Sequence, residues 1–268
     1  MPAFNAKAKA KPKAKPKPSG FAYARRAENA YGRALRSVAN QINAIVRGFE
    51  LADGEELVNA ADIEATLREY AHLIEPWARA VAARMLGEVE RRDYKAWSNV
   101  AERMRRNLRY EIKNAPTGEM LQRHLASQVD LITSLPLEAA ERVHTLTLEN
   151  IQTGTRAKEL AEDIYATGHV AKSRAMLIAR TETARTASAL VQARAQHIGS
   201  EGYIWRTVGD KDVRNVDGNP IGSHRKLNGK FIRWDSPPVA STNGVRAHAG
   251  QIYNCRCWPE PVVPEEPE

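Results

Sequence analysis

The feature that most constrains the fold is a long run of apolar residues spaced three and four apart in the first half of the chain. The run lasts about seven helical turns and consists of Ile63, Leu67, Tyr70, Ile74, Trp77, Val81, Met85 and Val89. This period is typical of an amphipathic helix that buries one face. Because Pro76 lies within the run, we expect the helix to be kinked or divided near Glu75.

Other stretches continue the helical pattern on both sides of this run. An apolar stripe within 21–48 precedes it, and a second stripe from Tyr94 to Ile112 follows it. We then predict separate helices over 118–133 and 136–152, because Pro136 suits the first position of a helix. A short helix should end at Gly168 and a longer one at Gly199, since glycine commonly follows a helix end. Small residues in "ARTETARTASA" on the longer helix should let another element approach closely.

Beyond Gly202 the pattern changes to strands and turns. The segments "YIWRTV" and "GKFIRW" are strand candidates, "VDGNPIG" is a turn candidate, and "DSPPVASTNG" is a long loop. The sequence therefore predicts an α+β chain, with an irregular N-terminal helical region followed by a small C-terminal α+β domain. The expected divisions are a disordered basic arm (1–20), a helical domain (21–152), the α+β domain (153–260) and an acidic, proline-rich tail (261–268).

The net charge of +8 is concentrated in the N-terminal arm. The arm is a low-complexity stretch of lysine, alanine and proline, and its positive charges are Lys7, Lys9, Lys11, Lys13, Lys15 and Lys17. Such an arm either contacts nucleic-acid phosphates or acts as a tail without a fixed partner. No apolar run approaches the roughly 18–20 residues that span a bilayer, so we expect no membrane partner. Two cysteines do not form a disulfide framework, which favours reduced thiols.

The two cysteines, Cys255 and Cys257, lie together in "NCRC" near the C-terminus. Neighbouring side chains of an extended segment alternate, so both thiols should face one side and Arg256 the other. With His224, and with His248 or Asp210 as a fourth ligand, they could bind zinc. Alternatively, both thiols pack as small apolar groups. No cofactor is firmly expected, with zinc as the one possibility.

No catalytic arrangement is complete in the sequence, and we assign no catalytic residue. Asp210 and Asp212 could serve as acid and base, but after a strand they more often form turns or pair with Arg214. Arg180 and Glu182 lie mid-helix and are most simply buried polar groups that pair with the β part, since a buried unpaired charge is costly.

Six motifs in order give the last third of the chain a resemblance to a known family. They are Arg180, Thr181 and Glu182; Trp205; Asp210, Val213 and Arg214; His224, Leu227 and Gly229; Pro237 and Pro238; and Asn254, Cys255, Arg256 and Cys257. This pattern resembles the C-terminal domain of Mu F-like phage head morphogenesis proteins, also called minor head proteins. One departure is the stretch Asn215 to Ser223, which lies where the family usually has a couple of residues.

The resemblance implies a non-enzymatic minor capsid protein that acts in phage head morphogenesis. It would be present in few copies, associate with the portal protein and the major capsid or scaffold protein, and reside in the virion after assembly in the host cytoplasm. Two alternatives stay open. One is a metal-dependent nuclease or hydrolase delivered with the genome, and the other is a packaging accessory that binds DNA through the lysine arm.

Overall fold

The computed structural model describes residues 20–49, 56–103, 109–153, 157–210, 213 and 223–264. Its helices are α1 (Arg25–Gly48), α2 (Glu56–Leu73), α3 (Glu75–Arg103), α4 (Arg109–Asn114), α5 (Gly118–Thr153), α6 (Ala157–His197) and α7 (His224–Leu227). Its strands are β1 (Gly202–Thr207), β2 (Phe231–Arg233) and β3 (Cys257–Pro261). The expected α+β class is confirmed.

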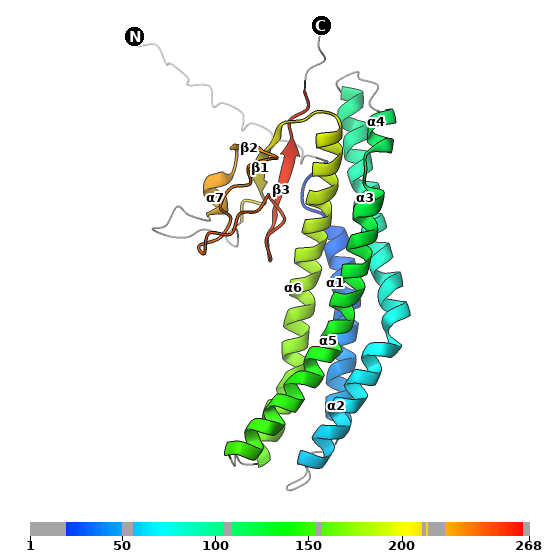
Figure 1. Ribbon diagram of the computed structural model, residues 1–268, viewed down its shortest axis with the longest axis vertical. Coiled ribbons are helices and arrows are strands. Elements are labelled where there is room, and N and C mark those ends of the chain that lie inside the picture. The colour runs from blue at the N-terminus through cyan, green and yellow to red at the C-terminus, as the bar shows by residue number, and fades with distance from the viewer. Residues whose placement is uncertain are drawn as a thin grey trace, which may run out of the picture.

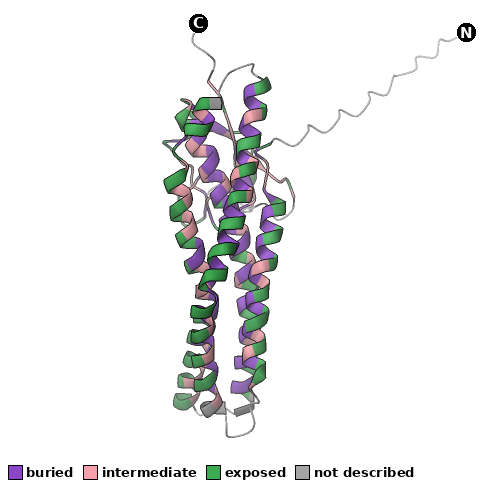
Figure 2. Cartoon of the chain, turned by 90° about the vertical axis from the view of Figure 1, so that its right-hand side faces the viewer, coloured by how far each residue is buried: buried purple, intermediate pink, exposed green. Residues whose placement is uncertain are grey.

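The long helices form an elongated antiparallel bundle (Figure 1). Helices α1 and α5 run in one direction, whereas α6 and the end-to-end pair α2 and α3 run in the other. Helix α6 has 41 residues, which makes it about 60 Å long at 1.5 Å per residue. Buried residues line the inner faces of the helices and exposed residues cover the outer faces (Figure 2). No helix within the described part of the chain is both long and apolar enough to cross a membrane.

Most of the apolar run of the first half is buried as its spacing predicts, whereas Tyr70 is half-buried and Trp77 is exposed. Ile63 and Leu67 on α2 are fully inaccessible to solvent, and Val81 and Val89 on α3 are also buried. They contribute to one large core together with α1, α5 and α6. The expected division near Glu75 is confirmed, because α2 ends at Leu73 and α3 begins at Glu75.

The prediction that Pro136 starts a new helix is wrong. Helix α5 continues from Gly118 to Thr153 with Pro136 inside it, although proline cannot donate the usual backbone hydrogen bond. Both Leu135 and Pro136 are buried, and the helix packs against α2, α3 and α6 along its length. Packing on both sides of the proline therefore outweighs the local cost of one missing hydrogen bond.

The prediction that a helix ends at Gly168 is also wrong, because α6 runs through this glycine to His197. The glycine serves close packing instead. A Cβ atom placed on Gly168 would lie 2.4 Å from Oδ1 and 2.7 Å from Cβ of Asn43 on α1. The expected end at Gly199 is confirmed by its left-handed φ of 80° just beyond the helix.

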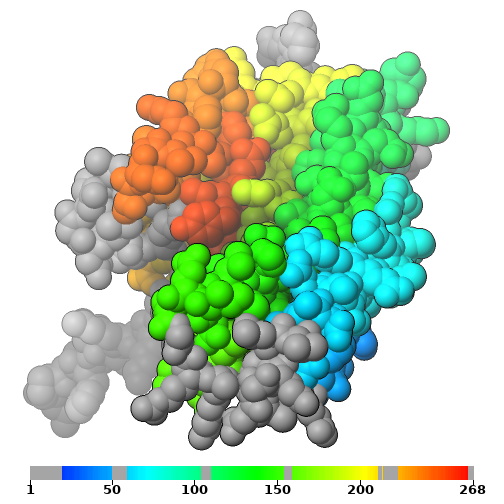
Figure 3. Space-filling model, turned by 60° about the horizontal axis from the view of Figure 1, so that its bottom comes forward, coloured from blue at the N-terminus to red at the C-terminus, as the bar shows by residue number. Residues whose placement is uncertain are grey.

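A small sheet packs beside the last part of α6 (Figure 1). Its three antiparallel strands lie in the order β2-β1-β3, so the first strand is central. Trp205 of β1 pairs with Pro259 of β3, and Tyr203 pairs with Ile232 on the other side. A second core under the sheet contains Val191 and Ala195 of α6 as well as the strand aromatics. Helix α6 thus contributes to both cores, and the space-filling view shows the C-terminal part directly beside the helices (Figure 3).

A buried ion pair joins three helices near this second core. Arg194 of α6 is only 3% exposed, and its guanidinium pairs with Asp93 and with Glu90 of α3, the latter at 2.8 Å. The same side chain donates to the Ile112 carbonyl oxygen of α4 at 3.2 Å. Burial of a guanidinium requires such partners, because an uncompensated charge in the interior costs several kcal/mol.

Some expectations fall on residues that the structure does not describe. These are the six lysines of the arm, Asp212, Arg214, the turn within 216–222 and the final residues 265–268. At the start of the expected tail, Pro261 is the last residue of β3.

We predict that Gly168→Ala destabilises the protein even though alanine is the better helix former. The added methyl group would collide with Asn43, whereas Gly87→Ala on the exposed face of α3 meets no atom within 4 Å. The control should gain up to about 1 kcal/mol in unfolding free energy. Urea unfolding of both variants tests this, and combining Gly168→Ala with Asn43→Ala should restore part of the loss. Equal stabilisation by the two glycine substitutions would contradict the packing argument.

Candidate functional site

The segment Gln251–Cys257, called here the closing segment, is fixed to α6 by Asn254. The Arg180 guanidinium donates to Asn254 Oδ1 at 2.7 Å, and the Asn254 backbone N–H donates to Thr181 Oγ1 at 2.9 Å. Asn254 has a φ of 56°, in the left-handed region that asparagine tolerates better than most residues. Two adjacent residues of α6 therefore hold both the backbone and the side chain of Asn254.

The third residue of the same motif, Glu182, links the closing segment to the bundle core. Its carboxylate accepts from Arg185 at 2.8 Å and from Gln128 Nε2 of α5 at 2.9 Å. Arg185 also donates through Nε to the Gln251 carbonyl oxygen at 2.7 Å. Gln128 in turn accepts from the buried Tyr31 hydroxyl at 2.9 Å. The chain of contacts thus runs from α1 through α5 and α6 to the closing segment.

Arg180 makes a second contact toward the start of α1. Its Nε donates to Glu28 Oε1 at 3.3 Å, and Glu28 also accepts from the Tyr23 hydroxyl. Glu28 is buried, so the guanidinium compensates its charge. Burial and the neighbouring Glu28 carboxylate raise the pKa of Tyr23, which keeps its hydroxyl protonated as a donor. The expected pairing of Arg180 with the C-terminal part is present, and Glu28 is an additional partner.

The loop that enters the closing segment approaches α6 closely at Gly250. A Cβ atom at this position would lie 3.1 Å from the Ala184 carbonyl oxygen and 3.2 Å from that of Cys257. Gly250 also has a φ of 88°, which is unfavourable for other residues. Small side chains on α6, including Ser188, permit this approach as the sequence suggested.

Beyond Asn254, both cysteines converge on one histidine nitrogen. The sulfur atoms of Cys255 and Cys257 lie 3.5 Å and 3.4 Å from Nδ1 of His224. All three side chains are buried, and their three donor atoms lie within 4.8 Å of one another. The other ring nitrogen, Nε2, lies 3.0 Å from the Ala240 carbonyl oxygen. The Trp205 ring packs edge-on against the His224 ring, with centroids 5.2 Å apart. Despite the long stretch before it, His224 reaches the cysteines.

The electrostatics of this group favour a thiolate. Hydrogen bonding from Cys257 holds the pKa of Cys255 well below its usual value, against the opposing effect of burial. The Cys257 backbone N–H lies 3.4 Å from Cys255 Sγ and contributes in the same direction. A thiolate, rather than a thiol, is the form that binds metals.

Arg256, between the two cysteines, forms a separate ion pair. Its two terminal nitrogens lie 2.8 Å and 2.9 Å from the two carboxylate oxygens of Asp210, in a bidentate arrangement. We expected Asp210 to pair with Arg214, which lies outside the described residues. The sequence analysis did not predict the pair of Asp210 with Arg256. The alternating directions of the thiols and the guanidinium agree with the expectation for an extended segment.

His248, considered as a fourth ligand, does not belong to the group of donors formed by His224 and the cysteines. Its Nδ1 lies 3.2 Å from the Tyr203 hydroxyl, which accepts from the Ala249 backbone N–H at 3.1 Å. Its ring also packs edge-on against Trp234 with centroids 5.6 Å apart. Burial lowers the pKa of His248, so the neutral form is favoured in the folded protein.

The structure therefore brings most of the expected residues into one continuous site. Arg180, Thr181 and Asn254 form the anchor, and His224, Cys255 and Cys257 form the cluster beyond it. Trp205 packs against the His224 ring. Sequence reasoning missed Glu28, Gln128 and Arg185, which complete the anchor from three helices. In the sequence, these residues are marked only by a charged or polar side chain at a position that faces the bundle interior. Such a mark does not identify the partner of the side chain.

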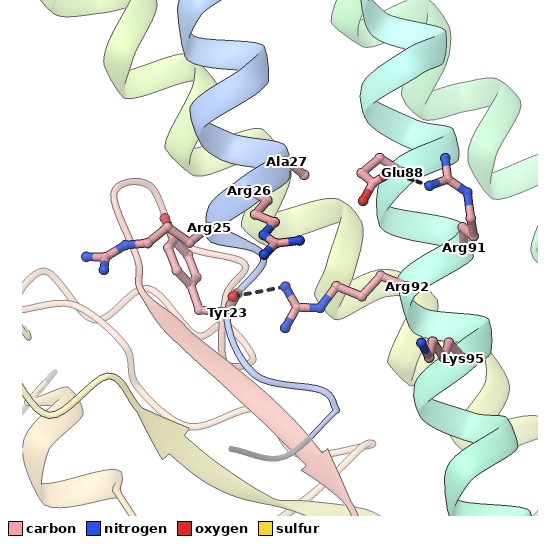
Figure 4. Close-up of a pocket in the computed structure, with 8 residues that line it drawn as sticks. All are labelled: Tyr23, Arg25, Arg26, Ala27, Glu88, Arg91, Arg92 and Lys95. Atoms are coloured by element: carbon pink, nitrogen blue, oxygen red, sulfur yellow. Dashed lines mark hydrogen bonds and ion pairs between the residues drawn. The ribbon is translucent and has the colours of Figure 1, made fainter. Parts of the chain in front are cut away.

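A basic pocket of about 510 Å³ lies between the start of α1 and α3 (Figure 4). It is lined by Tyr23, Ala27, Glu88 and five cationic side chains: Arg25, Arg26, Arg91, Arg92 and Lys95. Arg92 donates to the Tyr23 and Ala22 carbonyl oxygens at 3.1 and 2.6 Å, and Arg91 pairs with Glu88. Arg25, Arg26 and Lys95 are exposed at its rim, close to where the lysine arm joins the fold.

Comparison with known proteins gives a family for the part of the chain that holds this site. Residues 141–259 match the family described as "Phage Mu protein F like protein". The resemblance of the C-terminal region to this family is thereby confirmed. An uncharacterized protein of Haemophilus influenzae is 30% identical over 153 residues, which is 57% of this chain. The match covers 32% of that relative's length, and no solved structure matches significantly.

We predict that Thr181→Val loosens the closing segment. Valine keeps the shape but removes the oxygen that accepts the Asn254 N–H, at a cost of about 1–3 kcal/mol. Urea unfolding should show this loss, and the cysteines should react faster with a thiol reagent under native conditions. Thr183→Val is the matched control, since Thr183 is also buried on α6 and its hydroxyl has no hydrogen-bond partner among the described residues. Equal thiol reactivity in both variants would contradict the anchoring role.

We also predict that His248 makes the fold sensitive to acid. The pKa of His248 is lowered in the folded protein, so its contribution is complete above the unfolded pKa of about 6.5 and is lost as pH falls through the folded pKa. Urea unfolding at about pH 7.5 and about pH 5 should show a smaller loss of stability for His248→Gln than for the wild type. His124, whose pKa burial also lowers, is common to both proteins and cancels in this comparison. An identical loss of stability between the two pH values in the variant and in the wild type would contradict this role of His248.

Proposed function

We propose that the protein is a phage minor head protein whose C-terminal region is a structural module for head assembly. The observation that carries this proposal is the family match over residues 141–259, within which the family's motif residues meet in one folded site. Most of these side chains are buried and hold the chain together. Asp210, which a hydrolytic mechanism would need, is occupied by its bidentate pair with Arg256. We therefore propose a role without catalysis.

The proposal includes association with the portal protein and a low copy number in procapsid and virion. An elongated bundle with a sheet module on one side offers helical faces for protein partners, and the family resemblance points to the portal and to major capsid or scaffold protein. Quantitative mass spectrometry of purified procapsids and mature particles from the parent phage tests this. We expect a few copies per particle, reduced when the portal is deleted. Absence from every particle would overturn the proposal.

The basic pocket favours a second role, in contact with packaged DNA. Three exposed cations at its rim adjoin the arm, whose six lysines lie just before the described residues. A cluster of cations gains affinity for phosphates by releasing counterions, and this gain falls as salt rises. We propose that the pocket and the arm bind the phosphate backbone together, without reading the base sequence.

We predict that Arg26→Glu combined with Lys95→Glu weakens binding to duplex DNA and flattens its salt dependence. The matched control is Arg123→Glu combined with Lys172→Glu, which makes the same charge change at exposed sites of α5 and α6. Fluorescence anisotropy at several salt concentrations should give a slope smaller by about 2 for the pocket variant. Equal weakening by both variants would indicate only the overall charge, and no DNA binding by the wild type would exclude this second role.

A further inference from the structure

In the cluster of His224, Cys255 and Cys257, two sulfur atoms lie against the same histidine nitrogen, Nδ1. In neutral imidazole one ring nitrogen donates and the other accepts through a single lone pair. Here Nε2 faces the Ala240 carbonyl oxygen at 3.0 Å, which can only accept, so Nε2 carries the proton. Nδ1 then offers its lone pair, and two sulfur atoms lie at nearly equal distances from it. One lone pair cannot accept a good hydrogen bond from two thiols at once.

The two sulfur–nitrogen distances match edges of a tetrahedron around a metal ion. Zinc binds thiolate sulfur at about 2.3 Å and imidazole nitrogen at about 2.0 Å, which puts the sulfur and the nitrogen about 3.5 Å apart at a tetrahedral angle. The observed sulfur–nitrogen separations are 3.5 Å and 3.4 Å. A cation at the centre would use the lone pair and both sulfurs together. These are soft and borderline ligands, of the kind that selects zinc over magnesium or calcium.

The surroundings of the cluster are those of a metal site. The Ala240 carbonyl oxygen fixes the ring orientation of His224 and its tautomer, as outer partners of metal-binding histidines do. The Cys257 backbone N–H faces Cys255 Sγ at 3.4 Å, which stabilises a thiolate. The edge-on Trp205 ring and the core under the sheet exclude water from the ligands. The ligand-bearing segments are also held from outside the cluster, at Asn254 by α6 and at Arg256 by Asp210.

We propose that His224, Cys255 and Cys257 bind one zinc ion. Binding converts two thiols to thiolates and releases their protons, so Zn²⁺ and two thiols give a neutral zinc dithiolate and two protons. The ion joins the closing segment to α7, and these elements are 31 residues apart at Cys255 and His224. The proposal is independent of the role in head assembly, because it concerns the stability of this region alone.

The first test measures metal binding by the full-length wild-type protein. The protein is purified under reducing conditions, stripped with a chelator and titrated with Co²⁺, which gives a thiolate-to-metal absorption band. We expect one Co²⁺ per chain, displacement by Zn²⁺, release of protons and protection of both cysteines from alkylation. A folded, fully reduced wild-type protein that binds neither ion would overturn the proposal without any variant.

The second test assigns the ligands. Cys257→Ser and His224→Gln should each weaken Co²⁺ binding by more than about tenfold, and the cysteine variant should also reduce the absorption band. His248→Gln is the matched control, since it removes another buried histidine of the same module outside the cluster. Circular dichroism establishes that each variant is folded. Full Co²⁺ affinity in a folded Cys257→Ser variant, or equal loss in the His248→Gln control, would overturn the assignment.

Discussion

The C-terminal site depends on one interaction, the fixation of Asn254 on helix α6. Its backbone N–H and its side chain bind adjacent residues of a single helix, Thr181 and Arg180. Once both are fixed, the direction of the next three residues is determined, since side chains of an extended segment alternate. Cys255 and Cys257 must then face inward toward His224, and Arg256 must face Asp210. The first and last motifs of the family pattern therefore act as one contact.

The sequence predicted features that depend on local periodicity. The apolar run from Ile63 to Val89 identified buried helix faces, and alternation correctly placed the two thiols together. The break near Glu75 was also predictable, because Pro76 disfavours a continuous helix at this point. These predictions succeed because the signal and the structure share the same repeat.

The errors arose where packing between distant segments decides the outcome. Pro136 and Gly168 look locally like helix boundaries, but both lie inside continuous helices. Gly168 is needed for the approach of Asn43, far away in the sequence. Similarly, Asp210 was predicted to pair with Arg214, which is close to it in the sequence, whereas the structure pairs Asp210 with Arg256. A sequence shows which residues are neighbours along the chain, and not which residues are in contact. The partners Glu28 and Gln128 could not be predicted for the same reason.

The central role of α6 has a consequence for how the chain acquires its structure during synthesis. Its ion pairs join residues that are far apart in the sequence, since Glu28 and Arg180 are separated by 152 positions and Arg194 and Asp93 by 101. Helix α1 therefore leaves the ribosome long before its main partner, α6, exists. Much of its apolar face must stay exposed, or be shielded by other molecules, until the last long helix emerges. The vulnerable period of this protein is thus set by the order of its helices rather than by their individual stabilities.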